Sequence, residues 1–282
     1  MLPGTPSATA VSVASLRAAH LHLFEAPKIH EDTFAMQMCG AKDVEDLRAQ
    51  LEKRRLPNLQ RVSAYFACRH RFSEDRMRAA LNRGVRQVVL LGAGLDTLAL
   101  REPGIASRVS FVEIDHPDSQ RWKLERLRAL GFATPGVKYV PVDFSSQDLK
   151  QELAAAGLRL EQPTFFAWLG VSQYISEDAA TATLSLVGQF ASRSEIVFDV
   201  IVPFEDLRPD ELEISSAACA SSQERCEPWI SFYRTEEIGR RLLALGFSEV
   251  RPLTPEDTER YYNGQPAAVA PLNAWQLISA LV

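Results

Sequence analysis

The chain has 282 residues, of which 46% are hydrophobic and 24% charged, and its formal net charge is -5. This composition is that of an ordinary globular protein with enough chain to bury a core. The acidic balance argues against a nucleic-acid partner, because phosphate binding normally concentrates an excess of Lys and Arg. The stretch from Ser7 to Ser15 lacks the positive start and long apolar centre of a secretion signal, and no later run could span a bilayer. We therefore expect a cytoplasmic protein with no membrane partner.

Cysteine spacing gives no sign of a metal centre. Cys39, Cys68, Cys219 and Cys226 form no CxxC pair and have no histidine cluster nearby. We expect reduced thiols and no bound metal, with a bridge between Cys219 and Cys226 as the less favoured alternative.

The first part of the chain shows only helical patterns. From about Ser15 to Leu81 apolar residues recur at helical spacing, and no strand signal appears before Gln87. We predict that residues 1–82 form a helical cap and that residues 83–282 form the core.

The most informative segment is a strand that runs straight into a glycine turn and then a helix. Residues 87–97 read QVVLLGAGLDT, so an apolar strand is followed by Gly92, Ala93 and Gly94. Glycine adopts backbone angles closed to other residues and lets a ligand approach the main chain, while the next helix presents free N–H groups. This arrangement predicts a nucleotide-binding cradle.

An acidic residue follows the next strand. The strand predicted over 109–114 carries Glu113 and runs into Asp115, 21 and 23 residues beyond Gly92. A carboxylate about 20 residues after the glycine turn is typical of ribose recognition. The alternative is that Asp115 only caps the following helix, predicted over 117–130. The sequence favours a ligand that contains a ribose.

A third strand, over 137–142, ends in Asp143 and Phe144. The acid could accept adenine amino protons and the ring could supply an apolar face, although Asp143 could instead cap a helix beginning near Ser146. Dinucleotides and S-adenosylmethionine both use such a cradle, but a dinucleotide site expects a third glycine that is absent here. The pattern therefore favours S-adenosylmethionine.

Strands and helices alternate through the core, which predicts a mostly parallel sheet. The segment 203–228 is acidic and then rich in Ser, Ala and Cys, which indicates a partly helical lid above the strand ends. A helix and two final strands would close the sheet with a reversed hairpin, and a loop containing Gly264, Pro266 and Pro271 would join those strands. The remaining elements are predicted over 164–169 (strand), 195–200 (strand), 235–245 (helix), 247–253 (strand) and 273–282 (strand).

Several ordered motifs run along almost the whole chain. They are Arg69-His70-Arg71, QVVLLGAGLDTLALR (87–101), VEIDHPDSQRW (112–122), VPVDF (140–144), WLGVSQYI (168–175), Glu227-Pro228-Trp229, Gly246-Phe247 and Arg260-Tyr261. Together they resemble the leucine carboxyl methyltransferase family, especially its bacterial branch of small-molecule O-methyltransferases. The resemblance implies an α/β class I methyltransferase fold, Rossmann-like and doubly wound, with the helical cap and lid predicted above.

The same resemblance implies how S-adenosylmethionine is held. It assigns Arg69 to the methionine carboxylate, with Arg71 as the less favoured alternative, and Arg17 as a further basic contact. The other positions implied are Gly92 and its neighbours Ala93 and Gly94 along the backbone, Asp115 on the ribose, and Asp143 with Phe144 around the adenine.

One position departs from the family pattern. Protein-modifying members carry a glutamate on the loop after the fourth strand, where this chain has Leu169. Either the departure weakens cofactor binding or, as we favour, it marks the small-molecule branch.

The sequence identifies the residues that bind the methyl acceptor less clearly than those that bind the cofactor. Gln173 and Tyr174 follow the fourth strand, where acceptors usually bind in this fold, and Tyr233 and Arg234 are further candidates. A carboxylate acceptor, with a pKa of about 4, is already ionised at neutral pH and requires no general base. A phenol would need a base or cation, for which His116, Tyr174 or Arg234 could serve. No catalytic residue is identified.

The predicted activity is methyl transfer from S-adenosylmethionine, giving S-adenosylhomocysteine, to a carboxylate or hydroxyl of a small natural product. Three alternatives remain: a protein C-terminal carboxyl methyltransferase, a nicotinamide-dependent oxidoreductase and a non-catalytic cofactor-binding module. The sequence does not determine the oligomeric state.

Overall fold

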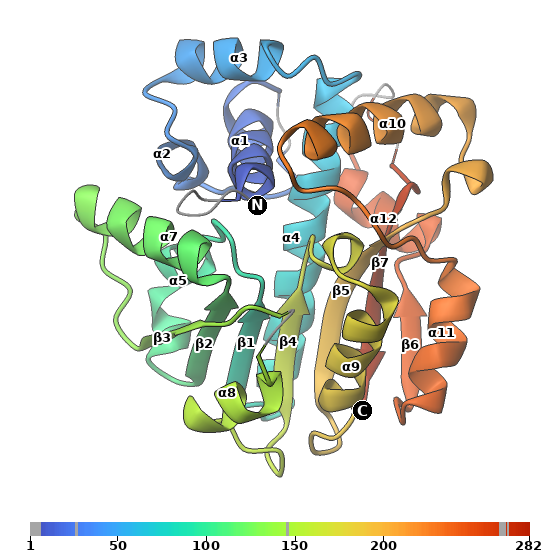
Figure 1. Cartoon of the computed structure of the whole chain (residues 1–282). Helices are drawn as coiled ribbons and strands as arrows, with labels where there is room; N and C mark the ends of the chain where they lie inside the picture. The colour runs from blue at the N-terminus through green and yellow to red at the C-terminus, as the bar shows by residue number, and fades with distance from the viewer. Residues whose placement is uncertain (1–6, 26–27, 145–146, 265–268, 270) are drawn as a thin grey trace.

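The structure, a computed structural model, describes residues 7–25, 28–144, 147–264, 269 and 271–282. Its centre is a seven-stranded sheet with the order β3-β2-β1-β4-β5-β7-β6 (Figure 1). The first five strands are parallel, whereas β7 pairs antiparallel with both β5 and β6. The predicted doubly wound sheet with a reversed last hairpin is confirmed. The strands are β1 (Gln87–Leu91), β2 (Ser110–Asp115), β3 (Val137–Pro141), β4 (Thr164–Trp168), β5 (Glu195–Ile201), β6 (Glu249–Pro252) and β7 (Trp275–Leu281).

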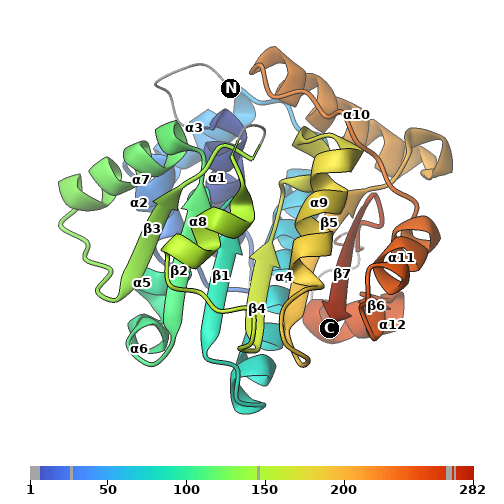
Figure 2. The same ribbon diagram turned by 60° about the horizontal axis from the view of Figure 1, so that its bottom comes forward.

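Helices cover both faces of the sheet, because the side chains of each buried strand alternate between two apolar layers. Val89 and Leu91 face the layer of α8, α9 and α11, whereas Val88 and Leu90 face that of α4, α5, α6 and α12. Figure 2 shows α8 and α9 in front of the sheet and α4 behind it. These helices are α4 (Leu59–Asn82), α5 (Leu98–Arg101), α6 (Pro103–Ala106), α8 (Leu149–Ala155), α9 (Glu177–Val187), α11 (Thr235–Ala244) and α12 (Pro255–Tyr262).

A third apolar cluster joins the N-terminal helices to the rest of the chain. It includes Leu16, Met38 and Leu47 from the first three helices, together with Ile214 and Trp275 from later elements. Figure 1 shows these helices, with α10, beyond the carboxyl ends of the parallel strands. The elements not yet named are α1 (Ala8–His22), α2 (Ala35–Cys39), α3 (Val44–Glu52), α7 (Pro117–Ala129), α10 (Pro209–Glu224) and the short 3-10 turns η1 (Ser172–Tyr174) and η2 (Phe204–Asp206).

Three elements differ from the sequence prediction. Helix α1 begins at Ala8, where the Ser7 side chain caps it by accepting from the Ala10 N–H. Helix α12 lies where only a loop was predicted between the last two strands; of that loop, Pro266 lies outside the described residues. The helix after β3 begins at Leu149 with Asp148 as its N-cap, while the predicted start near Ser146 is not described.

Cys219 and Cys226 are not joined by a disulfide, so the less favoured bridge is not formed. Among the described residues, no group of three or more His, Cys, Asp or Glu side chains could hold a metal ion. Within those same ranges no helix combines the length and apolar character that a bilayer span needs.

Candidate functional site

A cavity of about 600 Å³ opens at the carboxyl ends of the parallel strands, between the sheet and the helical cap. Small-molecule sites commonly measure about 300–1,000 Å³, and open α/β sheets bind ligands at this edge. The cavity draws side chains from strand ends, from α1 and α4 and from the segment after α10. Residues separated by two hundred positions in sequence therefore share one site.

The glycine turn after β1 forms one wall of this cavity. Gly92 has a φ of 65° and packs so closely on the loop after β4 that an added Cβ would lie 2.3 Å from Val171 Cγ2. The N–H of Ala93 donates to the carbonyl of Ile114 at 3.0 Å and ties the turn to the end of β2. Glycine is required at position 92 both by backbone conformation and by space.

The carboxylate of Asp115 is held at the tip of β2 by backbone donors. It accepts from the N–H of Gly94 and, at 2.7 Å, from that of His116. Burial raises the pKa of Asp115, and the two N–H groups oppose that shift without cancelling it. The capping alternative is not supported, since the N-cap of α7 is His116, whose Nδ1 accepts from the Asp118 N–H at 3.2 Å. Asp115 is thus oriented by the turn and lines the cavity.

The tips of β2 and β3 meet beside Asp115. The N–H of Val142 donates to the Asp115 carbonyl at 2.8 Å, and the following residues, Asp143 and Phe144, line the same cavity. Phe144 also packs against the apolar layer of α8 and α9. The two acids that follow neighbouring strands are therefore both among the residues that line this cavity.

Arg69 reaches the cavity from the middle of α4, where it is buried. Its Nη1 donates to Asp199 Oδ2 at 2.9 Å, while its Nε has no hydrogen-bond partner within the described ranges. An added Cβ at Gly170, whose φ is 70°, would lie only 2.9 Å from Arg69 Nη1. Gly170 thus leaves room for the guanidinium. Arg71 instead pairs with Asp75 on the exposed side of α4 at 3.0 Å.

Asp199 was not identified from the sequence. It lies near the end of β5, its second oxygen accepts from the Gly170 N–H at 2.6 Å, and Tyr65 Oη donates to it at 3.4 Å. The available signal was an acid near the carboxyl end of a core strand, which is the same signal that indicated Asp115.

Arg17 also lines the cavity, but the protein occupies its donors. Its Nε donates to Asp32 at 2.8 Å and its Nη2 to the carbonyl of Leu95 at 2.7 Å, and its Nη1 lies 3.3 Å from His70 Nε2. Burial and the charge of Arg17 lower the pKa of His70 well below its usual value, so the imidazole is neutral. Arg17 therefore secures the segment after the glycine turn.

The acceptor candidates divide into two groups. Gln173 and Tyr174 line the cavity, and Gln173 Oε1 is buried without a hydrogen-bond partner in the described part of the chain. Tyr233 and Arg234 are not among the lining residues: Tyr233 packs in the core near α11, and Arg234 pairs with Asp206 on the surface at 2.7 Å. The geometry gives no support to Tyr233 or Arg234 as acceptor contacts.

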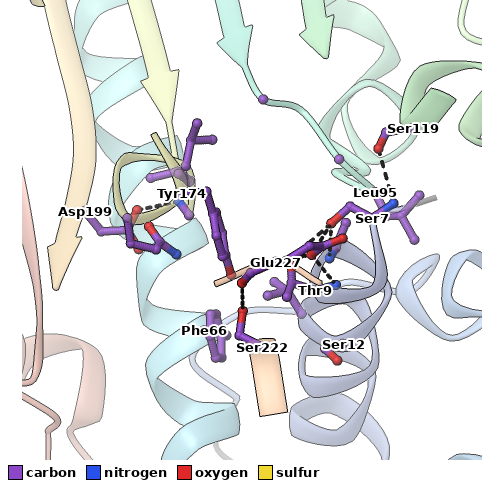
Figure 3. A pocket seen from close by; sticks show the side chains of 18 of the residues that line it. Ser7, Thr9, Ser12, Phe66, Leu95, Ser119, Tyr174, Asp199, Ser222 and Glu227 are labelled. Atoms are coloured by element: carbon purple, nitrogen blue, oxygen red, sulfur yellow. Dashed lines mark hydrogen bonds between the residues drawn. The ribbon is translucent and has the colours of Figure 1, made fainter. Parts of the chain in front are cut away.

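A contact between distant segments covers part of the cavity. The carboxylate of Glu227, just after α10, accepts from the N–H groups of Ala8 at 3.0 Å and Thr9 at 3.1 Å and from the Ser7 hydroxyl at 3.0 Å. Figure 3 shows Glu227 beside Ser7 and Thr9, with Asp199 and Tyr174 on the other side of the view. An anion at a helix N-terminus is favourable, so Glu227 anchors α1 to the predicted lid segment.

Leu169, at the position of the family's glutamate, lines the cavity and packs against the apolar layer of α4. The cavity wall is therefore apolar at the position where the family resemblance implies a glutamate carboxylate.

Comparison with protein families gives a direct match. The model of the leucine carboxyl methyltransferase family matches residues 10–188. YktD of Bacillus subtilis, provisionally named an S-adenosyl-L-methionine-dependent methyltransferase, is 26% identical over 281 residues, which covers 89% of each chain. A similarly named protein of Mycolicibacterium smegmatis is 32% identical over 223 residues, covering 75% of this chain and 72% of its own.

Solved structures show the same fold. A crystal structure from Thermobifida fusca, provisionally named a methyltransferase, superposes with a TM-score of 0.57 at 18% identity and covers 99% of this chain and 96% of its own. A protein of the DUF574 family from Streptomyces avermitilis also gives a TM-score of 0.57, at 15% identity, with 87% and 94% covered.

The family match favours S-adenosylmethionine over a nicotinamide cofactor. The residues fit this cofactor, because two neighbouring strand tips bring acids to the cavity, with the carboxylate of Asp115 oriented by the turn after β1. The buried guanidinium of Arg69, whose Nε has no hydrogen-bond partner among the described residues, lines the same cavity. The chain belongs to the leucine carboxyl methyltransferase family and uses S-adenosylmethionine to methylate its substrate.

Proposed function

We propose that this methyltransferase acts on an oxygen, a carboxylate or a hydroxyl, of a small natural product in the cytoplasm. The observation that carries the proposal is the cavity of about 600 Å³, which combines the strand-tip acids with an apolar and aromatic wall from the cap. The cofactor would take much of this volume, and a small acceptor suits the remainder. Cysteines that form no disulfides suit a reducing compartment.

In this proposal the strand tips hold the cofactor. Asp115 accepts hydrogen bonds from the ribose hydroxyls, Asp143 and Phe144 frame the adenine, and the backbone from Gly92 to Gly94 lines the methionine part. Arg69 binds the methionine carboxylate through N–H groups that Asp199 does not use. Arg17 acts indirectly by holding the segment after the glycine turn.

The bound cofactor supplies an electrophilic methyl group, so the chain's task is to orient the acceptor oxygen in line and to exclude water. A carboxylate acceptor needs no general base, because it is ionised at neutral pH. For a phenol, with a pKa of about 10, His116 and Tyr174 line the cavity and are groups that could handle the proton.

The test is methyl transfer from labelled S-adenosylmethionine to two sets of acceptors. One set contains small carboxylic acids and phenols, and the other contains peptides with a free C-terminal leucine. We expect transfer to members of the first set and none to the peptides. Transfer only to the peptides would establish the protein-modifying alternative, whereas cofactor binding without transfer to either set would favour a non-catalytic module.

A further inference from the structure

Two arginines line the cavity from the side of the cap, away from the strand tips. Arg54 lies in the loop after α3, and Arg225 directly follows α10. Figure 1 shows α3 and α10 at the edge of the molecule beyond the carboxyl ends of the strands. The two guanidinium groups therefore come from elements that do not form the cofactor cradle.

Neither guanidinium forms an ion pair with a carboxylate of the described residues. Arg54 Nη2 donates to Ser15 Oγ at 3.2 Å, and its Nη1 is buried without a hydrogen-bond partner. Arg225 Nη1 donates within its own helix end, to Ser221 Oγ at 2.7 Å and to the Ser221 carbonyl at 3.1 Å. Both side chains thus keep donors for a ligand.

Four of the acids that line the same cavity have partners other than these arginines. Asp199 pairs with Arg69 at 2.9 Å, and Glu227 accepts from the start of α1. Asp115 accepts from the turn after β1 and from His116, and Asp96 accepts from the Leu98 N–H at 2.7 Å. The positive charge of the arginines is therefore not neutralised by these side chains.

The unpaired arrangement is electrostatically unfavourable. Burial, and then the nearby charge of Arg225, lower the pKa of Arg54 from its usual 12.5 to about 10, so that the guanidinium is still charged at neutral pH. Like charges in a partly desolvated site repel each other, and an anion placed between them would relieve that repulsion. Paired guanidinium groups match the flat, acceptor-only geometry of a carboxylate.

The wall beside these arginines is apolar and aromatic. Trp275 packs against Tyr65 and Phe66 with ring centroids 5.0 and 5.6 Å away, and Trp229 meets it edge-on at 6.4 Å. The Nε1 atoms of both tryptophans are buried without partners in the described ranges. The wall can therefore cover a ring system and still offer N–H donors.

We infer that Arg54 and Arg225 bind an anionic group of the methyl acceptor that is distinct from the methylated oxygen. Resting on the proposed function, this inference narrows the acceptor to an aromatic or alicyclic organic acid. Its acid group lies against the cap, its rings lie on the wall of Trp229 and Trp275, and its nucleophilic oxygen lies toward the strand tips.

The experiment measures binding of matched acids and amides in place of the unidentified acceptor. Cinnamate, naphthoate and biphenylcarboxylate, each with its primary amide, are titrated at pH 7 into the whole protein saturated with S-adenosylhomocysteine. Tryptophan fluorescence reports binding, because Trp229 and Trp275 line the cavity. We expect at least one acid to bind about tenfold more tightly than its amide, the usual effect of a charged hydrogen bond.

Arg54→Gln and Arg225→Gln should each reduce this preference, and the double variant should abolish it. The matched control is Arg48→Gln on the exposed side of α3, which should keep it. If no acid binds more tightly than its amide, or if the preference survives in the double variant, the inference is wrong. Binding of S-adenosylhomocysteine is measured on every variant. A variant that still binds S-adenosylhomocysteine is folded. An unmodified protein that does not bind S-adenosylhomocysteine would instead contradict the proposed function.

Discussion

The guanidinium of Arg69 and the carboxylate of Asp199 form an ion pair of 2.9 Å in which the two side chains are only 5% and 4% exposed. Asp199 uses its other oxygen to accept from the Gly170 N–H at 2.6 Å. One carboxylate near the end of β5 therefore fixes both a helix side chain and the loop after β4. This relationship positions Arg69 at the cavity, and among the described residues its Nε has no hydrogen-bond partner.

Replacing Arg69 tests its proposed contact with the methionine carboxylate. Arg69→Gln should weaken binding of S-adenosylhomocysteine by about 1.5 to 3 kcal/mol, the usual contribution of a hydrogen bond to a charged group. Calorimetric titration gives the affinity. The control is Arg71→Gln, since Arg71 is exposed on the same helix and pairs with Asp75. Equal affinities for both variants would remove Arg69 from the cofactor site.

The turn after β1 should not tolerate a side chain. Gly92→Ala places a methyl group 2.3 Å from Val171 Cγ2 and forces alanine into a left-handed conformation, so unfolding free energy should fall by about 1 to 3 kcal/mol. Urea denaturation measures this loss. Adding Val171→Ala should restore the steric part but leave the backbone strain, and a double variant no more stable than Gly92→Ala would contradict the clash.

Glu74 should make stability depend on pH. It accepts from Arg101 at 2.5 Å and pairs with His30 at 3.0 Å. Burial alone would raise the pKa of Glu74, but the His30 hydrogen bond and the Arg101 charge outweigh it and hold the pKa well below 4.5. An acid with a lowered folded pKa stabilises the fold above its unfolded pKa, and this contribution is lost as the pH falls further.

Glu74→Gln should therefore lower the unfolding free energy at pH 7 by about 3 kcal/mol, since it leaves the buried Arg101 charge with the more distant carboxylate of Asp32, 3.7 Å away, in place of its closest ion pair. The difference from the unmodified protein should shrink as the pH falls from 5 to 3. Urea denaturation at several pH values measures it, and a difference independent of pH would show that the charge of Glu74 is unimportant.

Glu227 should stabilise the position of the start of α1 beside the cavity. Glu227→Gln removes the charge that faces the N–H groups of Ala8 and Thr9. Hydrogen exchange at these amides should become about tenfold faster, corresponding to about 1.4 kcal/mol. Glu224→Gln, at an exposed position of the preceding helix, is the control. Unchanged exchange in the Glu227 variant would mean that other contacts hold α1 in place.

Much of the core could be predicted because its strands are apolar runs bounded by clear turn signals. The predicted bounds of β1 are confirmed. Its five residues are all buried, and the strand ends at Leu91, directly before Gly92. Helix α12 was missed because its sequence, PEDTERYY, is polar at the start and lies between a proline and a glycine, which reads as a loop. Local pattern alone does not reveal packing against α4.

The candidate site, too, could be predicted only where its residues stand out in the local sequence. Asp115 and Asp143 follow strands at positions that sequence spacing makes visible. Asp199 lies within the apolar strand EIVFDVI, and its partner Arg69 is 130 residues away, so only the folded chain brings them together. Arg234 was expected near the acceptor, but the nearby acids Glu205 and Asp206 hold it on the surface.

The most direct test of the account is calorimetric titration of S-adenosylmethionine and S-adenosylhomocysteine into the unmodified protein and into Asp115→Ala. Asp178→Ala, at an exposed position of α9, is the control. Because the two ligands share one ribose, Asp115→Ala should weaken both by a similar factor of about ten or more, while the control leaves both affinities unchanged. An unchanged affinity in Asp115→Ala, or a loss confined to one ligand, would contradict the assignment of the strand-tip carboxylate to the ribose.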